Sequence, residues 1–218
     1  MRVLRLRDGE DVTASDGAGS WRPCHLRIRV GADPVLEPAG PLVFEPAPDP
    51  KVTVAVALPK GERGDWAVQK LTEVGADAIV PLVTRRSVVR WGGEREGRGM
   101  ERFARVARAA AMQARRVRLP ELGTPIAVAD LIGEAGRTSA GLCAAEPGGG
   151  PPRLDNPTVL VGPEGGWEPG ELPDAAVVPR IGLGPNVLRT ETAAVVAASA
   201  LVMLRSFKGS GQGPGHGE

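Results

Sequence analysis

The chain has 218 residues, 42% hydrophobic and 24% charged, which is the composition of a globular protein that buries a core, and its formal net charge is only +1. Its two cysteines, Cys24 and Cys143, lie far apart and outside any CxxC motif, so they predict neither a disulfide framework nor a zinc site and favour a reducing compartment. The sequence opens without the apolar run of a signal peptide, and no stretch approaches the roughly 20 apolar residues of a membrane span, so we expect a cytoplasmic protein.

The N-terminal part of the chain predicts a small β domain over residues 1–48. Strand-like segments at Arg2–Leu6, Cys24–Val30 and Leu42–Phe44 are separated by polar turns, of which Asp16–Gly19 is the clearest. Six prolines between residues 34 and 50 argue against any helix there, because proline lacks the backbone donor that a helix interior needs. This domain is expected to end in a proline-rich linker.

From Lys51 onward, strands alternate with helices, which predicts an α/β domain with a mostly parallel sheet over residues 49–208. Strands are expected at Val52–Leu58, Ala78–Val83, Ala140–Ala145, Thr158–Val161 and Ala176–Ile181, and helices at Trp66–Val74, Met100–Arg116 and Thr190–Ser206. Gly75 stands where a helix C-cap glycine belongs, and residues 92–99 are expected to form a glycine-rich loop. The last helix is apolar almost all round, which indicates burial in the domain or against a second subunit. Residues 209–218 are expected to be a disordered tail.

Several common classes of enzyme are disfavoured by motifs that the sequence lacks. The only histidines, His25 and His216, lie in the β domain and the tail, so no HExxH motif, histidine metal cluster or Ser-His-Asp triad is expected. There is no GxxxxGK phosphate loop and no complete GxGxxG fingerprint. A metalloenzyme, a kinase and a nicotinamide-dependent dehydrogenase are therefore disfavoured.

The segment Val159–Gly166 is the first candidate for chemistry. A buried strand runs into Gly-Pro-Glu-Gly-Gly, followed by Trp167 and an expected short helix from Pro169. Glycines let the backbone approach a ligand closely and leave amide donors uncovered, and Glu164 would stand at the carboxyl end of a strand, where α/β sheets bind ligands. The alternative is an ordinary strand-to-helix turn with an exposed glutamate.

The segment Ile181–Thr192 is the second candidate. A strand again ends in a Gly/Pro loop, which then presents Arg189, Thr190 and Glu191 at the start of the last helix. Thr190 or Thr192 can cap this helix, and Glu191 suits its positive end. Capping does not explain Arg189, because a cation at a helix N-terminus is electrostatically misplaced, so it needs a partner in Glu191, Glu164 or a ligand.

Together, the segments LVGPEGGW and LGPNVLRTETAA resemble the signature of the SPOUT class of RNA methyltransferases, and more closely that of the RsmE family, ribosomal RNA small subunit methyltransferase E. The resemblance extends over most of the chain: Leu58–Gly75, the basic stretch from Arg85 to Ser87 and Gln113–Pro120 are also similar to the family. The chain departs from the family before Val3-Leu4-Arg5-Leu6, where the usual segment is either missing, which would shorten the β domain, or lost through a misassigned start codon. Met112 stands where glutamate is common, and Ala140–Pro147 matches only loosely the loop expected to form one wall of the cofactor site.

This resemblance implies a fold, a cofactor and a target. The fold would be a SPOUT-type trefoil-knotted parallel sheet with helices on both faces, preceded by a PUA-like β domain that binds RNA. The protein would be a homodimer that uses S-adenosyl-L-methionine to methylate N3 of a uridine in 16S rRNA of the small ribosomal subunit, with no metal and no membrane partner. The residues expected at the cofactor are Leu160, Gly162, Pro163, Glu164, Gly165, Gly166, Ile181, Leu183, Gly184, Val187, Leu188, Arg189 and Thr190.

We assign hypothetical roles to the charged residues on chemical grounds. Arg189 would stabilise the negative charge that develops on the uracil ring, and Glu191 or Glu164 would take the N3 proton, with Glu191 preferred. RNA contacts are expected from Lys60, Arg63, Lys70, Arg85, Arg86, Arg115, Arg116 and Arg118. Arginine suits phosphate, although a GC-rich genome produces the same arginine bias and each residue alone can be a solvated surface charge. The alternatives are a methyltransferase for another rRNA or tRNA position, and a non-catalytic RNA-binding assembly factor.

Overall fold

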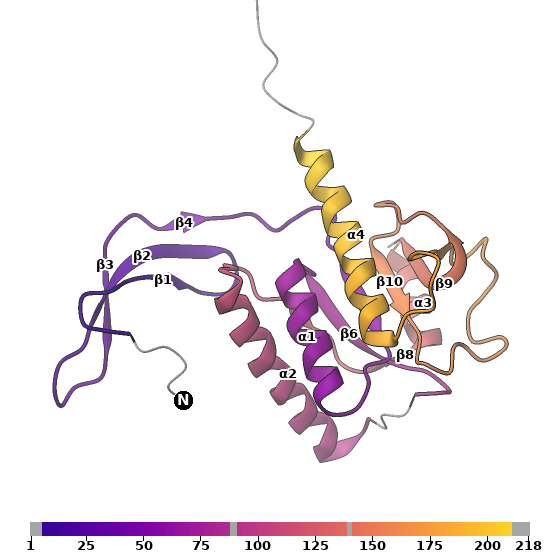
Figure 1. The fold of residues 1–218 in the computed structure, drawn as a ribbon, viewed down its shortest axis with the longest axis horizontal. Coiled ribbons are helices and arrows are strands. Elements are labelled where there is room, and N and C mark those ends of the chain that lie inside the picture. Colours follow the sequence, from indigo (N-terminus) through magenta and orange to yellow (C-terminus); the bar gives the residue numbers. More distant parts are fainter. Residues whose placement is uncertain (1–5, 88–90, 139–140, 211–218) are drawn as a thin grey trace, which may run out of the picture. The chain divides into compact units, whose positions relative to one another are not determined.

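The computed structural model describes residues 6–87, 91–138 and 141–210, and the chain divides into two compact units. Within the described residues, unit 1 consists of residues 6–47 and 115–119, and unit 2 of residues 48–114 and 120–210, so the chain enters unit 1 twice. Figure 1 shows the strands of unit 1 in indigo and violet and the sheet and helices of unit 2 from magenta to yellow.

Unit 1 is an antiparallel sheet of four strands: β1 (Asp11–Ser15), β2 (Ser20–Arg27), β3 (Val35–Pro38) and β4 (Val43–Phe44). The strand β2 pairs with each of the other three. The expected turn joins β1 to β2, where the Asp16 carboxylate accepts the amides of Ala18 and Ser20, and these hydrogen bonds lower the pKa of Asp16. The strand expected at residues 2–6 lies almost entirely outside the described residues.

The segment Arg115–Leu119 belongs to unit 1 although it follows a helix of unit 2. The Val117 carbonyl accepts the Ser15 hydroxyl at 2.8 Å, and Arg118 pairs with Ala18 in an antiparallel bridge. The Arg118 guanidinium donates to the Glu45 carbonyl and lies over a phenylalanine ring of β4. The helix expected to reach residue 116 therefore ends earlier, and the chain turns out of it through Arg115, whose φ is 54°.

Unit 2 contains a seven-stranded sheet in which every pairing is parallel, which confirms the fold class expected from the alternation of strands and helices. The strand order is β11-β9-β10-β5-β6-β7, with β8 paired to β6. The strands are β5 (Thr53–Val56), β6 (Ala78–Val83), β7 (Glu121–Leu122), β8 (Ile126–Ala127), β9 (Leu142–Gly150), β10 (Thr158–Val161) and β11 (Arg180–Ile181).

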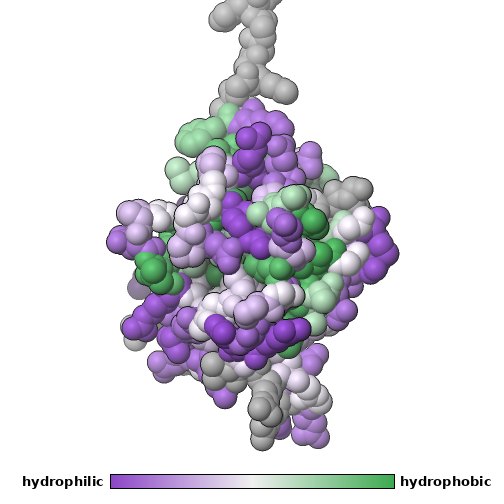
Figure 2. Space-filling view, turned by 90° about the vertical axis from the view of Figure 1, so that its right-hand side faces the viewer, coloured by the Kyte–Doolittle hydropathy of each residue, from purple (hydrophilic) through white to green (hydrophobic). Residues whose placement is uncertain are grey.

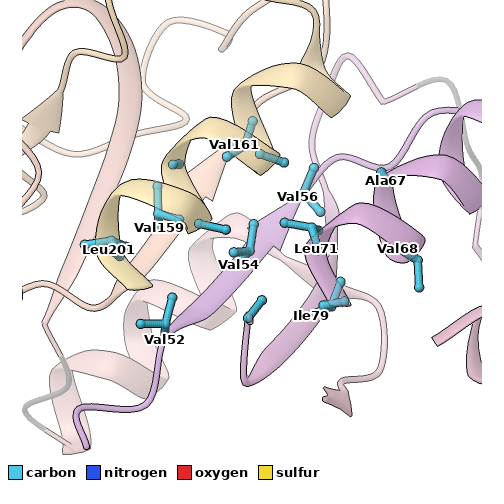
Figure 3. Close-up of a cluster of buried hydrophobic side chains, with 14 of the residues drawn as sticks. Val52, Val54, Val56, Ala67, Val68, Leu71, Ile79, Val159, Val161 and Leu201 are labelled. Atoms are coloured by element: carbon cyan, nitrogen blue, oxygen red, sulfur yellow. The ribbon is translucent and has the colours of Figure 1, made fainter. Parts of the chain in front are cut away.

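Helices cover both faces of this sheet because successive strand residues point to opposite sides. Val54 and Val159 face a core shared with α1 (Glu62–Val74), α2 (Gly93–Gln113) and α4 (Thr190–Ser210). Ala55 and Leu160, one residue further along, face the opposite core, which α3 (Val128–Thr138) covers. Figure 3 shows the first core, with Leu201 of α4 beside the valines of β5 and β10.

One local expectation about helices is wrong, and one helix was not predicted. Residues 93–99 begin α2 instead of forming a loop, with Glu94 and Glu96 in its first turn, where the positive end of the helix favours acids. Packing of Phe103 into the core anchors this helix despite its glycines. The helix α3 was not expected, and it forms because Val128 and Ala135 pack against the sheet.

The last helix, α4, is a core helix on one face only. It buries Ala194, Ala197, Ala198 and Leu201 completely, whereas Phe207 is 68% exposed. By length and composition alone, residues 190–208 pass the test for a membrane-crossing helix, and a third of that window is buried inside the fold. Because the buried face is continuous with the core of the sheet, we interpret α4 as part of the domain core.

The buried thiol of Cys143 on β9 gives a test of this core. Burial raises the pKa of Cys143 from 9.0 to about 12. Because the thiolate is the reactive form, a C24A variant should react with a thiol reagent at pH 8 only as fast as the protein unfolds, and at once in denaturant. Because folding raises the pKa of Cys143, the thiol contributes to the free energy of unfolding below pH 9, and this contribution is lost as the pH rises toward about 12. The free energy of unfolding of C143A should therefore fall less over that range than that of the wild type. Rapid labelling of the native protein at pH 8 would contradict the burial.

Candidate functional site

The carboxyl ends of β5 and β10 lie side by side, and this pairing places the first motif loop beside the turn that follows β5. Val56 pairs with Val161, so the chain leaves both strands at the same edge of the sheet. After β10, the loop from Gly162 to Gly166 needs its glycines: a Cβ on Gly162 would lie 2.9 Å from the Trp167 ring, and Gly166 has φ of 70°. The expected glycine-rich loop thus forms a tight turn capped by an indole ring.

The second motif loop runs from β11 to the start of α4. The Thr190 hydroxyl, in a residue that is 3% exposed, donates to the Gly162 carbonyl at 3.0 Å, and this bond joins the two loops. Of the two threonines suggested as caps of α4, both lie inside the helix, and the Thr190 hydroxyl bonds to the neighbouring loop. The short helix expected from Pro169 is not formed. Residues 168–171 form a turn instead, in which the Glu168 amide donates to the Glu171 carboxylate.

The end of β9 supplies a third wall. Glu146 forms an ion pair of 2.6 Å with Arg180, which fixes the end of β9 beside β11. Gly149 and Gly182 meet backbone to backbone, and a Cβ on Gly149 would lie 2.5 Å from the carbonyl carbon of Ile181. Only glycine allows these two chains to approach so closely.

These three segments enclose a pocket of about 230 Å³. Its lining combines aliphatic side chains with glycine backbone: Ala145, Glu146, Pro147, Val161, Gly162, Pro163, Glu164, Gly166, Trp167, Leu183, Gly184, Asn186, Val187, Leu188, Thr190 and Ala193. Figure 2 views the side of the molecule on which β9 lies in Figure 1, and apolar residues gather there among strongly polar ones.

Most of the residues expected at the cofactor line this pocket. Four do not: Leu160 and Ile181 are core residues, 0% and 3% exposed, Gly165 packs against Arg86, and Arg189 is exposed beside the pocket. The pocket also includes residues that were not among those expected at the cofactor, namely Ala145, Glu146, Pro147, Val161, Trp167, Asn186 and Ala193. Of these, Ala145, Glu146 and Pro147 belong to β9, which the sheet order brings beside the loops.

The charged residues of the site form one cluster. Nη1 of Arg63, in the first turn of α1, lies 2.9 Å from Oε1 of Glu164 and 3.9 Å from Oε1 of Glu191. Glu191 is buried, and its Oε2 has no hydrogen-bond partner among the described residues. The Arg189 side chain forms no ion pair with any residue in the described ranges, so it is not the partner of either carboxylate.

The residues expected to bind RNA occupy different settings. Lys60 and Arg85 have exposed side chains, and Lys70 pairs with Glu73 at 2.6 Å. Arg86 donates to the Gly165 carbonyl and to Glu168, so in this structure it holds the first motif loop. Arg63 belongs to the charged cluster, and Arg115, Arg116 and Arg118 belong to unit 1. No group of three or more potential metal ligands occurs among the residues that the structure describes.

Comparison with known proteins supports the class of RNA methyltransferases that the two motif segments resemble. Residues 45–202 match the family described as RNA methyltransferase domain. The ribosomal RNA small subunit methyltransferase E of Mycobacterium bovis is 37% identical over 224 residues, which cover 94% of this chain and 82% of that protein. The enzyme of the same name from Bacillus subtilis is 29% identical over 223 residues, covering 92% of this chain and 84% of that protein.

Solved structures agree with this grouping. A probable rRNA-methyltransferase from Porphyromonas gingivalis superposes with a TM-score of 0.79 at 26% identity, covering 95% of this chain and 90% of that one. A putative methyltransferase from Legionella pneumophila in complex with SAM superposes with a TM-score of 0.78 at 29% identity, covering 93% and 86%. The fold is thus that of the SPOUT-type RNA methyltransferases. Within that class, the chain belongs to the family of ribosomal RNA small subunit methyltransferase E.

The bond between Thr190 and Gly162 gives a test of how the two motif loops are held. T190V removes the hydroxyl and leaves a backbone acceptor unpaired, which should lower the free energy of unfolding by about 1–2 kcal/mol. Hydrogen exchange in residues 162–166 should also become faster. T192V is the matched control, because Thr192 is half-buried on the same turn and its hydroxyl makes no such bond in the structure. Equal effects of the two substitutions would show that the bond does not hold the loops.

Proposed function

We propose that this protein transfers a methyl group from S-adenosyl-L-methionine to N3 of a uridine in 16S rRNA of the small ribosomal subunit. The observation that carries the proposal is the single pocket built from both motif loops, with the Glu164 carboxylate in its lining. Membership of the family supports the methylation of small-subunit rRNA. The choice of uridine N3 rests on the resemblance of the two motif segments and on the chemistry available beside the pocket.

The pocket residues fit the proposed cofactor. Leu183, Val187 and Leu188 offer aliphatic contacts for a purine ring, and the glycine backbone of both loops leaves amide and carbonyl groups for its polar edges and for a ribose. When bound, S-adenosyl-L-methionine supplies an electrophilic methyl group. The task of the protein is then mainly to hold the acceptor nitrogen in line with that group.

The residues beside the pocket suit the acceptor. Uracil N3 carries a proton at neutral pH, and its removal leaves a negative charge shared with O2 and O4. Arg189, exposed at the N-terminus of α4 and without an ion-pair partner among the described residues, is available to stabilise that charge. Glu164 and Glu191 are the two carboxylates available to take the proton.

We also propose that the protein acts in the cytoplasm as a homodimer and binds the rRNA through basic residues of both units. The outer face of α4 leaves Met203 56% and Phe207 68% exposed, which is apolar surface of the kind that subunit interfaces cover. A monomer by light scattering at working concentration would contradict the dimer.

The first experiment is calorimetric titration with S-adenosyl-L-methionine, followed by methyl transfer to small subunits that lack the modification. Binding together with transfer to one uridine N3 would support cofactor, reaction and target at once. Binding without transfer to these subunits would point to another rRNA or to tRNA as substrate. Failure to bind the cofactor would favour a non-catalytic RNA-binding assembly factor.

The role of Arg189 can be tested separately from cofactor binding. R189A should lower kcat by roughly 100-fold, which is the range for loss of one donor to developing charge, while the cofactor Kd changes little. The two quantities separate because the Arg189 side chain does not line the pocket. Equal losses in kcat and in cofactor affinity would show that Arg189 binds the cofactor instead.

A further inference from the structure

The positive charge of Arg63 is unfavourable at its position in α1. It lies in the first turn of α1, whose N-terminus carries partial positive charge and has no side-chain cap. The chain nevertheless builds a specific turn there: Gly61 has φ of 65°, and a Cβ on Gly64 would lie 2.6 Å from the Pro59 carbonyl. This turn directs Arg63 to the carboxylates that follow β10 and β11.

The two carboxylates that Arg63 meets are not equivalent. The Glu164 side chain is 40% exposed and lines the pocket, whereas the Glu191 side chain is 9% exposed and does not line it. Oε2 of Glu191 is fully buried without a donor among the described residues, so a substrate base cannot approach that oxygen. The more accessible carboxylate at the pocket is therefore Glu164.

The guanidinium lies close to both carboxylates through the same nitrogen, which is hydrogen-bonded to Glu164. Nη1 contacts Glu164 at 2.9 Å and Glu191 at 3.9 Å, so the buried end of the cluster is Glu191 and the pocket end is Glu164. An ion pair this exposed contributes little to stability, because water screens it. A geometric role explains the arrangement better than a stabilising one.

We propose that Arg63 is a positioning residue: with the buried Glu191 carboxylate close to the same nitrogen, it fixes the Glu164 carboxylate at the edge of the pocket, and Glu164 is the group that accepts the substrate proton. The proton passes from the acceptor nitrogen to a carboxylate oxygen of Glu164, which becomes a neutral acid, while the nitrogen keeps the electron pair that forms the new bond to the methyl carbon. That carbon would give up its bond to the sulfonium sulfur of the cofactor, and the sulfur would keep the bonding pair as a neutral thioether. This inference rests on the proposed function and replaces the assignment of Arg63 to RNA contact and the preference for Glu191 as proton acceptor.

The test compares R63Q, R63K, E164Q and the double variant R63Q/E164Q in the full-length protein. R63Q and E164Q should each lower kcat by about 100-fold, the cost typical of losing general-base help or its alignment, with subunit KM nearly unchanged. The cofactor Kd should be nearly unchanged in R63Q, because Arg63 does not line the pocket. The double variant should be no slower than the slower single variant, because both remove the same function. R63K should recover much of the rate. R98Q, which removes an exposed pair with Glu94 on α2, is the matched control and should leave the rate unchanged.

Three results would overturn the proposal. A higher subunit KM in R63Q at unchanged kcat would assign Arg63 to RNA binding. Multiplying losses in the double variant would show that Arg63 and Glu164 act independently. Full activity of E164Q would exclude Glu164 as the proton acceptor.

A readout without catalysis separates this inference from the proposed substrate. If the wild-type protein transfers no methyl group to small subunits, the substrate is wrong, and hydrogen exchange then decides the role of Arg63. R63Q should speed exchange in residues 162–167 whereas R63K should not, because lysine keeps the charge that holds Glu164. Unchanged exchange in R63Q would refute the positioning role.

Discussion

The parallel pairing of β10 between β5 and β9 is the constraint on which the site depends. Leu160 lies opposite Ala55 on one side and Ala144 on the other, and all three are completely buried. A shift of one residue would turn the valines of β10 toward the α3 side and Leu160 toward α4, and both cores would lose their packing. The register therefore fixes where β10 ends, and with it the place where Glu164 meets the turn after β5.

Sequence alone predicted the parts of the molecule that local patterns specify. Strands at Ala78–Val83 and Thr158–Val161 have the expected bounds, because short apolar runs end there at charged or glycine-containing turns. Gly75 ends α1 with φ of 99°, as its position after the apolar helix face indicated. The pocket loops were also predictable, because each is contiguous and its glycines and prolines are visible in the sequence.

The remaining parts depend on contacts between segments far apart in the chain. Nothing local indicates that Arg115–Leu119 joins the β domain, since its partners Ser15 and Gly19 lie about a hundred positions away. Glycines at residues 133 and 136 weaken the helical pattern of α3, and only burial of Val128 and its neighbours against the sheet overrides that weakness. The pocket wall from β9 also requires the position of β9 beside β10, and the sequence indicated it only through the loose family resemblance of residues 140–147.

Two arginines, Arg189 and Arg63, lie at helix N-termini, where a positive charge is unfavourable. The sequence predicts a partner for Arg189, because its positive charge is unfavourable beside the positive end of α4. Arg63 occupies the same kind of position at the start of α1, and the structure supplies its partners, Glu164 and Glu191. The two helices thus bring one paired and one unpaired guanidinium, among the described residues, to the same edge of the sheet. A paired guanidinium suits the orientation of a carboxylate, whereas an unpaired one is free to meet charge that arises only during a reaction.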